Sequence, residues 1–142
     1  MKTEELLTQI ETIRSRYQNA CTSNNIDLLL EYQDKMACLN STLGDSIADF
    51  KEQYYNAEYL RDLEIEEAKL YNIDKGIGVT EAGSRAKVKC KDRIKEAREL
   101  KAIWYKLNEK GKNNKGILSA MQQRLSYSKD EWKLKKFIQN KS

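Results

Sequence analysis

The sequence contains no histidine and no proline, and these two absences set the first limits on its fold and function. Histidine is the usual general acid or base near neutral pH and the commonest metal ligand, so its absence argues against most acid–base and metal-dependent catalysis. Proline interrupts the hydrogen-bond ladder of a helix, so its absence permits long helices anywhere in the chain. We therefore predict a protein that is not an enzyme and has no cofactor and no metal site.

Cysteines and long apolar runs are also scarce. The three cysteines, Cys21, Cys38 and Cys90, are odd in number and show no Cys-x-x-Cys spacing, which predicts reduced thiols rather than a disulfide framework. The N-terminal residues lack the apolar segment of a signal peptide, and no apolar run approaches the ~20 residues that span a membrane. We expect a cytoplasmic protein with neither a membrane nor a small molecule as its partner.

Strong helix formers and charged residues make up most of the chain. Of its 142 residues, 39% are hydrophobic and 34% are charged, which suits one domain with a narrow apolar core. Apolar residues recur at three- and four-residue steps, and no segment alternates as a strand would. The sequence therefore predicts an all-α fold, in a single domain of residues 1–142.

Four helices are predicted, separated by breaks at residues 22–25, 74–79 and 111–116. Gly76 in the second break can adopt the left-handed conformation that closes a helix. A short turn between two long helices is typical of an antiparallel hairpin, so we expect a long, coiled-coil-like helical hairpin with additional N- and C-terminal helices. The expected N-caps are Thr3, Asn25 and Thr80. The expected helices span residues of about 3–21, 26–73, 81–110 and 117–139.

Each hairpin arm carries one apolar stripe. The stripe of the second arm begins with small residues near the turn, which would let the tip close tightly. The stripe of the first arm is Leu29, Tyr32, Met36, Leu39, Leu43, Ile47, Phe50, Tyr54, Ala57 and Leu60. The stripe of the second arm is Ala82, Ala86, Cys90, Ile94, Ala97, Leu100, Trp104 and Leu107. The apolar side of the last helix is Ile117, Met121, Leu125, Trp132 and Phe137.

Charge is divided unevenly along the chain. Residues 1–84 carry 8 basic and 16 acidic side chains, whereas residues 85–142 carry 18 basic and 6 acidic ones. If the turn centres near Ile77, the numbers of facing residues sum to roughly 154, which places Glu64, Glu66 and Glu67 opposite residues 87–90. We therefore predict that ion pairs between the arms fix the register of the hairpin.

The basic residues beyond the hairpin are the candidate binding site, for a partner or for phosphate groups. Trp132 and Phe137 interleave with them, an arrangement that can contact phosphates and stack on bases. In the alternative interpretation, these aromatics are core or oligomer contacts and the lysines form a solvated face. The candidate residues are Lys110, Lys112, Lys115, Arg124, Lys129, Trp132, Lys133, Lys135 and Lys136.

Two other patterns lie on the first hairpin arm, and neither indicates a metal or catalytic site. Glu58, Asp62 and Glu66 share a helix face, but carboxylates on one helix rarely hold a metal ion without ligands from other helices. Tyr55 and Tyr59 lie on a second face of the same helix, beside the stripe, which favours packing of another helix or subunit there. A homo-oligomer is therefore expected.

Three short segments resemble those of small helical coiled-coil proteins from the early and recombination regions of phage genomes. They are Tyr59-Leu60 with the acidic residues that follow, residues 78–82, and Leu125-Ser126 with Lys129 and Glu131. The resemblance covers residues 55–135 and implies a phage origin, a bacterial host cytoplasm and a role near nucleic acid. We predict a binding protein that acts on nucleic acid or on a nucleic-acid-processing complex, including inhibition of a host defence complex. The alternative is a structural coiled-coil oligomer or virion component.

Overall fold

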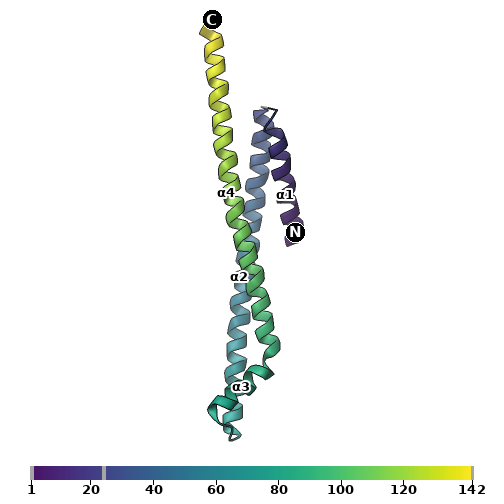
Figure 1. Ribbon diagram of the computed structural model, residues 1–142, viewed down its shortest axis with the longest axis vertical. Helices are drawn as coiled ribbons and strands as arrows, with labels where there is room; N and C mark the ends of the chain where they lie inside the picture. The colour runs from purple at the N-terminus through teal and green to yellow at the C-terminus, as the bar shows by residue number, and fades with distance from the viewer. Residues whose placement is uncertain (1, 24, 142) are drawn as a thin grey trace. The chain divides into compact units, whose positions relative to one another are not determined.

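The computed structural model describes residues 2–23 and 25–141, except for the side chain of Lys141, and shows an all-α protein (Figure 1). Asn24, which belongs to the first predicted break, lies outside the described residues. The described residues form helices and turns with no strand, which confirms the predicted fold class. The helices are α1 (Thr3–Ala20), α2 (Ile26–Asp74), α3 (Val79–Lys89) and α4 (Lys91–Lys141).

The chain packs into two compact units. The three-helix unit comprises Met1–Ser46 and Glu109–Ser142, and the hairpin unit comprises Ile47–Asn108. Each unit combines an acidic segment from the first half of the chain with a basic segment from the second half. The hairpin unit therefore holds 13 basic and 12 acidic residues, and the three-helix unit holds 13 and 10. The charge imbalance along the sequence is not an imbalance between the two units, and the single domain over residues 1–142 stays a prediction.

The core of the three-helix unit is built from apolar stripes, which in α2 and α4 are the predicted ones. Leu6 and Ile10 of α1, Met36 and Leu43 of α2, and Met121 of α4 are at most 2% exposed. Asn25 caps α2 as expected, because its Oδ1 accepts a hydrogen bond of 3.1 Å from the backbone N–H of Leu28. The other two predicted caps are wrong by one or two residues, since Lys2 and Gly78, not Thr3 and Thr80, precede α1 and α3.

The turn of the hairpin unit closes as the sequence predicts. Gly76 has a φ of 90°, which a residue with a Cβ rarely adopts. The N–H of Ile77 donates to the carbonyl of Asn72 at 3.1 Å and the N–H of Gly76 to that of Ile73 at 2.9 Å, the pair of bonds that defines a Schellman ending. Ala68 and Ala86 pack together just behind this turn, so small side chains do allow the arms to approach closely.

The register of the hairpin changes along its length. Asn72 donates to the carbonyl of Ala82 at 3.4 Å, which fits the expected sum of 154. Farther from the turn the sum rises, to 157 for Glu64 and Arg93 and to 158 for the stacked rings of Tyr54 and Trp104. The cause is an interruption at Cys90, which separates α3 from α4 (Figure 1) and adds residues to one arm only.

The predicted ion pairing between the arms is mostly wrong. Among the residues that the structure describes, the only ion pair joining two helices is Glu64–Arg93, at 3.0 Å. Arg85 instead pairs with Glu81 on its own helix at 2.7 Å, and the register of 154 near the turn places it opposite Lys69 rather than an acid. Exposed pairs of this kind contribute only ~0–1 kcal/mol each, so apolar packing and the turn set the register.

The expected break at residues 111–116 is absent, and α4 runs without interruption from Lys91 to Lys141. Two glycines in a helix cost roughly 1 kcal/mol each, but packing offsets this cost. Asn114, which lies within the predicted break, is 5% exposed, and it lines a hollow beside Ile10 of α1. The separate helices predicted over residues 81–110 and 117–139 are therefore wrong. Leu60 is also misplaced, since it is 39% exposed and not on the buried stripe of α2.

Candidate functional site

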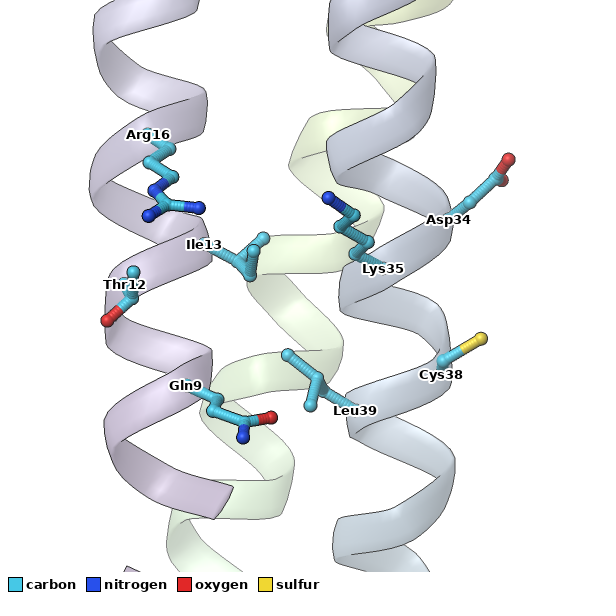
Figure 2. Close-up of a pocket in the computed structure, with 8 residues that line it drawn as sticks. All are labelled: Gln9, Thr12, Ile13, Arg16, Asp34, Lys35, Cys38 and Leu39. Atoms are coloured by element: carbon cyan, nitrogen blue, oxygen red, sulfur yellow. The ribbon is translucent and has the colours of Figure 1, made fainter. Parts of the chain in front are cut away.

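An apolar groove of about 460 Å³ lies between α1 and α2 of the three-helix unit. Ile13 and Leu39 point into it, while the carboxylate of Asp34 and the thiol of Cys38 point away (Figure 2). The hydroxyl of Thr12 donates to the carbonyl of Thr8 at 2.9 Å, so it too is directed to the backbone. The groove therefore brings together no nucleophile and base, and it offers only apolar contact.

The C-terminal part of α4 is very different. Every residue from Lys129 to Asn140 is exposed, including Trp132 at 54% and Phe137 at 56%. The buried stripe of α4 stops at Leu125, and the residues from Lys129 to Asn140 that follow it are exposed. The prediction that Trp132 and Phe137 belong to the apolar core of the chain is therefore wrong. An exposed helix of this length is available to a partner.

Four of the predicted lysines lie on one face of this continuous helix. Lys115, Lys129, Lys133 and Lys136 are separated by 14, 4 and 3 residues, spacings that return to the same side of a helix. All four are exposed; Glu131 lies on the opposite side of the helix, whereas Asp130, three residues before Lys133, lies at the edge of their face. We call these four residues the basic row.

The remaining candidate residues lie elsewhere. Arg124 donates a hydrogen bond of 3.3 Å to the carbonyl of Cys21 and so fastens α4 to the end of α1. Lys112 pairs with Glu109 of its own helix at 3.5 Å. Lys110 lines the hollow that also contains Glu11, and Lys135 lies on a different face from the basic row. The predicted site residues therefore do not form one continuous surface.

Trp132 lies beside the basic row and next to the start of α2. The ammonium of Lys136 is 4.9 Å from the centre of its indole ring, a favourable cation–π distance. A hollow of about 530 Å³ lies between this segment and Asn25, Ile26 and Asp27. The indole thus has a lysine on one side and open space next to it.

The sequence did not predict the second aromatic group, which lies in the hairpin unit. Tyr54 and Trp104 stack with ring centres 5.7 Å apart, and Tyr55 lies 6.0 Å and Tyr105 5.1 Å from Trp104. We call these four residues the aromatic cluster. The pattern of each helix placed Tyr54 and Trp104 on buried stripes, but only the observed register shows that they meet.

Two lysines lie against the rings of the aromatic cluster. The ammonium of Lys51 is 5.8 Å from the ring centres of both Tyr55 and Trp104. The ammonium of Lys101 is 5.9 Å from the ring of Tyr54 and 5.5 Å from that of Tyr105. All four distances are within the range of cation–π attraction. The cluster therefore combines exposed ring surface with positive charge.

One acidic side chain near the cluster, Glu58, is already engaged. The hydroxyl of Tyr54 donates to Glu58, and this hydrogen bond to a carboxylate, followed by burial, raises the pKa of Tyr54 above its ordinary value. Arg61 lies 3.9 Å from the same carboxylate. The carboxylate of Glu58 therefore interacts with both the hydroxyl of Tyr54 and the guanidinium group of Arg61.

No group of three or more metal-ligating side chains comes together in the part of the chain that the structure describes. Within the same residues, no helix is both long enough and apolar enough to cross a membrane. Comparison of this chain with protein-family models, curated proteins and solved structures gives no match. The resemblance to phage early-region proteins therefore stays a prediction, and function must be argued from the two sites.

Proposed function

We propose that this protein is a non-enzymatic binding protein that contacts nucleic acid through the basic row of α4. The observation that carries the proposal is the placement of Lys115, Lys129, Lys133 and Lys136 along one exposed face, where the lysines outnumber the acids beside them, Asp130 at the edge of the face and Asp27 of α2. At 1.5 Å per residue the row extends about 32 Å, close to one turn of B-form DNA at roughly 34–36 Å. Such a row can neutralise several phosphates of a backbone and release their counterions.

The charges of this face are well suited to a polyanion. The four ammonium groups are exposed, so binding does not require them to leave a buried partner. Trp132, beside the row, adds a ring that can stack on a base or lie against a sugar. A row of lysines contacts phosphate without reading base sequence, so we expect binding with little sequence preference.

The test is fluorescence anisotropy with labelled single- and double-stranded oligonucleotides at ~50 mM salt. We expect binding by the native chain, and a loss of affinity of about tenfold or more when Lys129, Lys133 and Lys136 are replaced by glutamine. A matched control replaces Lys2, Lys87 and Lys106, which are exposed lysines outside the row, and should lose less. Absence of binding by the native chain, or equal losses in both variants, would contradict the proposal.

In a phage-infected cell the partner can be a nucleic-acid-processing complex, such as a host defence complex, in place of free nucleic acid. The same exposed segment supports this form of the proposal, because a basic helix also fits an acidic protein surface. Affinity capture from bacterial lysate with and without nuclease separates the two forms. Capture that survives nuclease treatment and depends on the basic row identifies a protein partner, and capture that nuclease abolishes identifies nucleic acid.

A structural, self-associating function is the second candidate. Tyr55, Tyr59, Leu63 and Leu70 of α2 follow one another along a second helix face and are 41–67% exposed. A second copy of the chain could cover this row and form a coiled-coil oligomer or an assembly component. Light scattering tests this directly: a monomer at ~100 µM would exclude it, whereas a stable dimer or larger species that forms without the basic row would support it.

A further inference from the structure

The rings of the aromatic cluster come from two helices of the hairpin unit and pack against one another across the helix pair. Tyr54 and Tyr55 come from α2, and Trp104 and Tyr105 come from α4. The ring centres of neighbouring members are 5.1–6.0 Å apart. Such distances are those of favourable aromatic pairs, so each ring holds its neighbours in place.

The two outer rings of the cluster are open to solvent. Tyr54 is 7% exposed, as a core residue would be, but Tyr55 is 51% and Tyr105 is 53% exposed. A cluster that only filled the hairpin core would bury these rings as well, since aromatic side chains gain most from burial. Rigid, half-exposed rings around an indole are a surface on which a planar group can stack.

Positive charge follows this surface along α4. Lys51 and Lys101 lie against the rings, as described above. Lys91 and Arg98 are 14 and 7 residues before Tyr105, which places all three on one side of the helix. This side spans about 21 Å. The basic side chains therefore form a track that leads to the rings.

Flat rings combined with a basic track fit one class of ligand. Every nucleobase has a face that stacks on an aromatic ring, and its phosphate can bind a nearby ammonium group. In a duplex the base faces are already stacked on one another, so only unpaired bases are available. We propose that the aromatic cluster is a stacking site for single-stranded nucleic acid. This inference rests on the proposed function and names the strand class at a second site.

The experiment uses the two tryptophans of the chain as separate reporters. In the Trp132→Phe variant only Trp104 fluoresces, and in the Trp104→Phe variant only Trp132 does. Each is titrated with oligo(dT) of about 15 nucleotides and with a duplex of equal length. We expect the single strand to quench Trp104 emission in the Trp132→Phe variant, and the duplex to leave it nearly unchanged.

A second variant separates stacking from charge. Replacing Tyr55 and Tyr105 with leucine keeps apolar volume at two half-exposed positions but removes the flat rings. We expect this variant to bind the single strand about tenfold more weakly and the duplex with unchanged affinity, since one stacked base contributes ~1–3 kcal/mol. Circular dichroism before each titration confirms that the variant is folded.

The possible results distinguish the two proposals. Quenching of Trp132 alone overturns this inference and leaves the basic row as the binding site. Quenching of Trp104 alone supports this inference and overturns the assignment to the basic row. Equal quenching of Trp104 by duplex and single strand, or equal affinity after loss of the two tyrosine rings, overturns the stacking site. No binding of either strand overturns both proposals.

Discussion

Each of the two tryptophans has a lysine against its ring, but the two indoles are packed very differently. Trp104 lies in the hairpin unit among three tyrosines from two helices, with Lys51 against its ring. Trp132 lies in the three-helix unit on a part of α4 where every side chain is exposed, with Lys136 against its ring. Packing fixes the first indole, whereas a single helix turn positions the second.

The difference separates two ways of contacting a nucleic acid. A ring held by other rings is pre-organised and can discriminate between stacked and unstacked bases. A ring on an exposed helix beside a row of lysines contributes contact area, but the lysines supply most of the attraction and do not discriminate between strands. The two proposals together therefore predict that the hairpin unit supplies selectivity for strand type and the basic row supplies overall affinity.

The largest expected difference between the two tryptophans is in stability. Trp104→Ala removes the central ring of the cluster, and we expect the free energy of unfolding to fall by about 3 kcal/mol, the low end for aromatic residues because Trp104 is partly exposed. Trp132→Ala removes an exposed ring and should change it by no more than ~0.5 kcal/mol. Urea unfolding followed by circular dichroism measures both. Similar losses of unfolding free energy in the two variants would mean that the two indoles are packed equally well.

Alkaline unfolding gives the next largest effect, and it concerns the unit that holds Trp132. Burial, with a smaller contribution from Cys21, raises the pKa of Tyr17 to about 12. Its hydroxyl donates to the carbonyl of Met121 at 3.4 Å. A raised pKa favours the neutral phenol in the folded state, so the contribution is present below pH ~10 and is lost between pH ~10 and ~12.

We expect the native chain to lose up to about 2 kcal/mol over this pH range and Tyr17→Phe to lose less. Tyr54 of the hairpin unit also has a raised pKa, because its hydroxyl donates to Glu58, so the comparison with Tyr17→Phe isolates the contribution of the three-helix unit. Unfolding curves at a series of pH values test this. An unchanged pH dependence in the phenylalanine variant would show that Tyr17 does not ionise on unfolding as proposed.

The smallest effect tests whether one continuous helix connects the segments that carry the two tryptophans. A Cβ added at Gly116 meets nothing within 4 Å, so Gly116→Ala should stabilise the chain by about 0.5–1 kcal/mol if this residue is helical. The same change at Gly76, where φ is 90°, should destabilise it by about 1 kcal/mol. Thermal unfolding of the two variants measures the contrast, and destabilisation by Gly116→Ala would favour a break there.

Much of the fold follows from the spacing of apolar residues. Most of the stripe from Leu29 to Ala57, the turn closed by Gly76 and the small residues behind that turn are where the sequence places them. The continuity of α4 could not be predicted, because the two glycines favour a break and only packing of Asn114 and its neighbours offsets that preference.

The candidate site was predicted only in part. The lysines of the basic row follow from composition, and their common face follows once α4 is known to be continuous. The aromatic cluster could not be found in this way, because a register of 154 places Tyr54 opposite Leu100 and not Trp104. The interruption at Cys90 changes the register, and no local pattern signals it.

The most direct test of the central proposal is the salt dependence of nucleic-acid binding. For the native chain, the logarithm of the association constant should fall linearly with the logarithm of salt concentration, with a slope of about −0.9 per duplex phosphate neutralised. Replacement of Lys129, Lys133 and Lys136 by glutamine should reduce the magnitude of that slope by about 2–3 for a duplex, whereas replacement of Lys2, Lys87 and Lys106 should reduce it by less than 1. The same slope in the native chain and the basic-row variant would contradict the account.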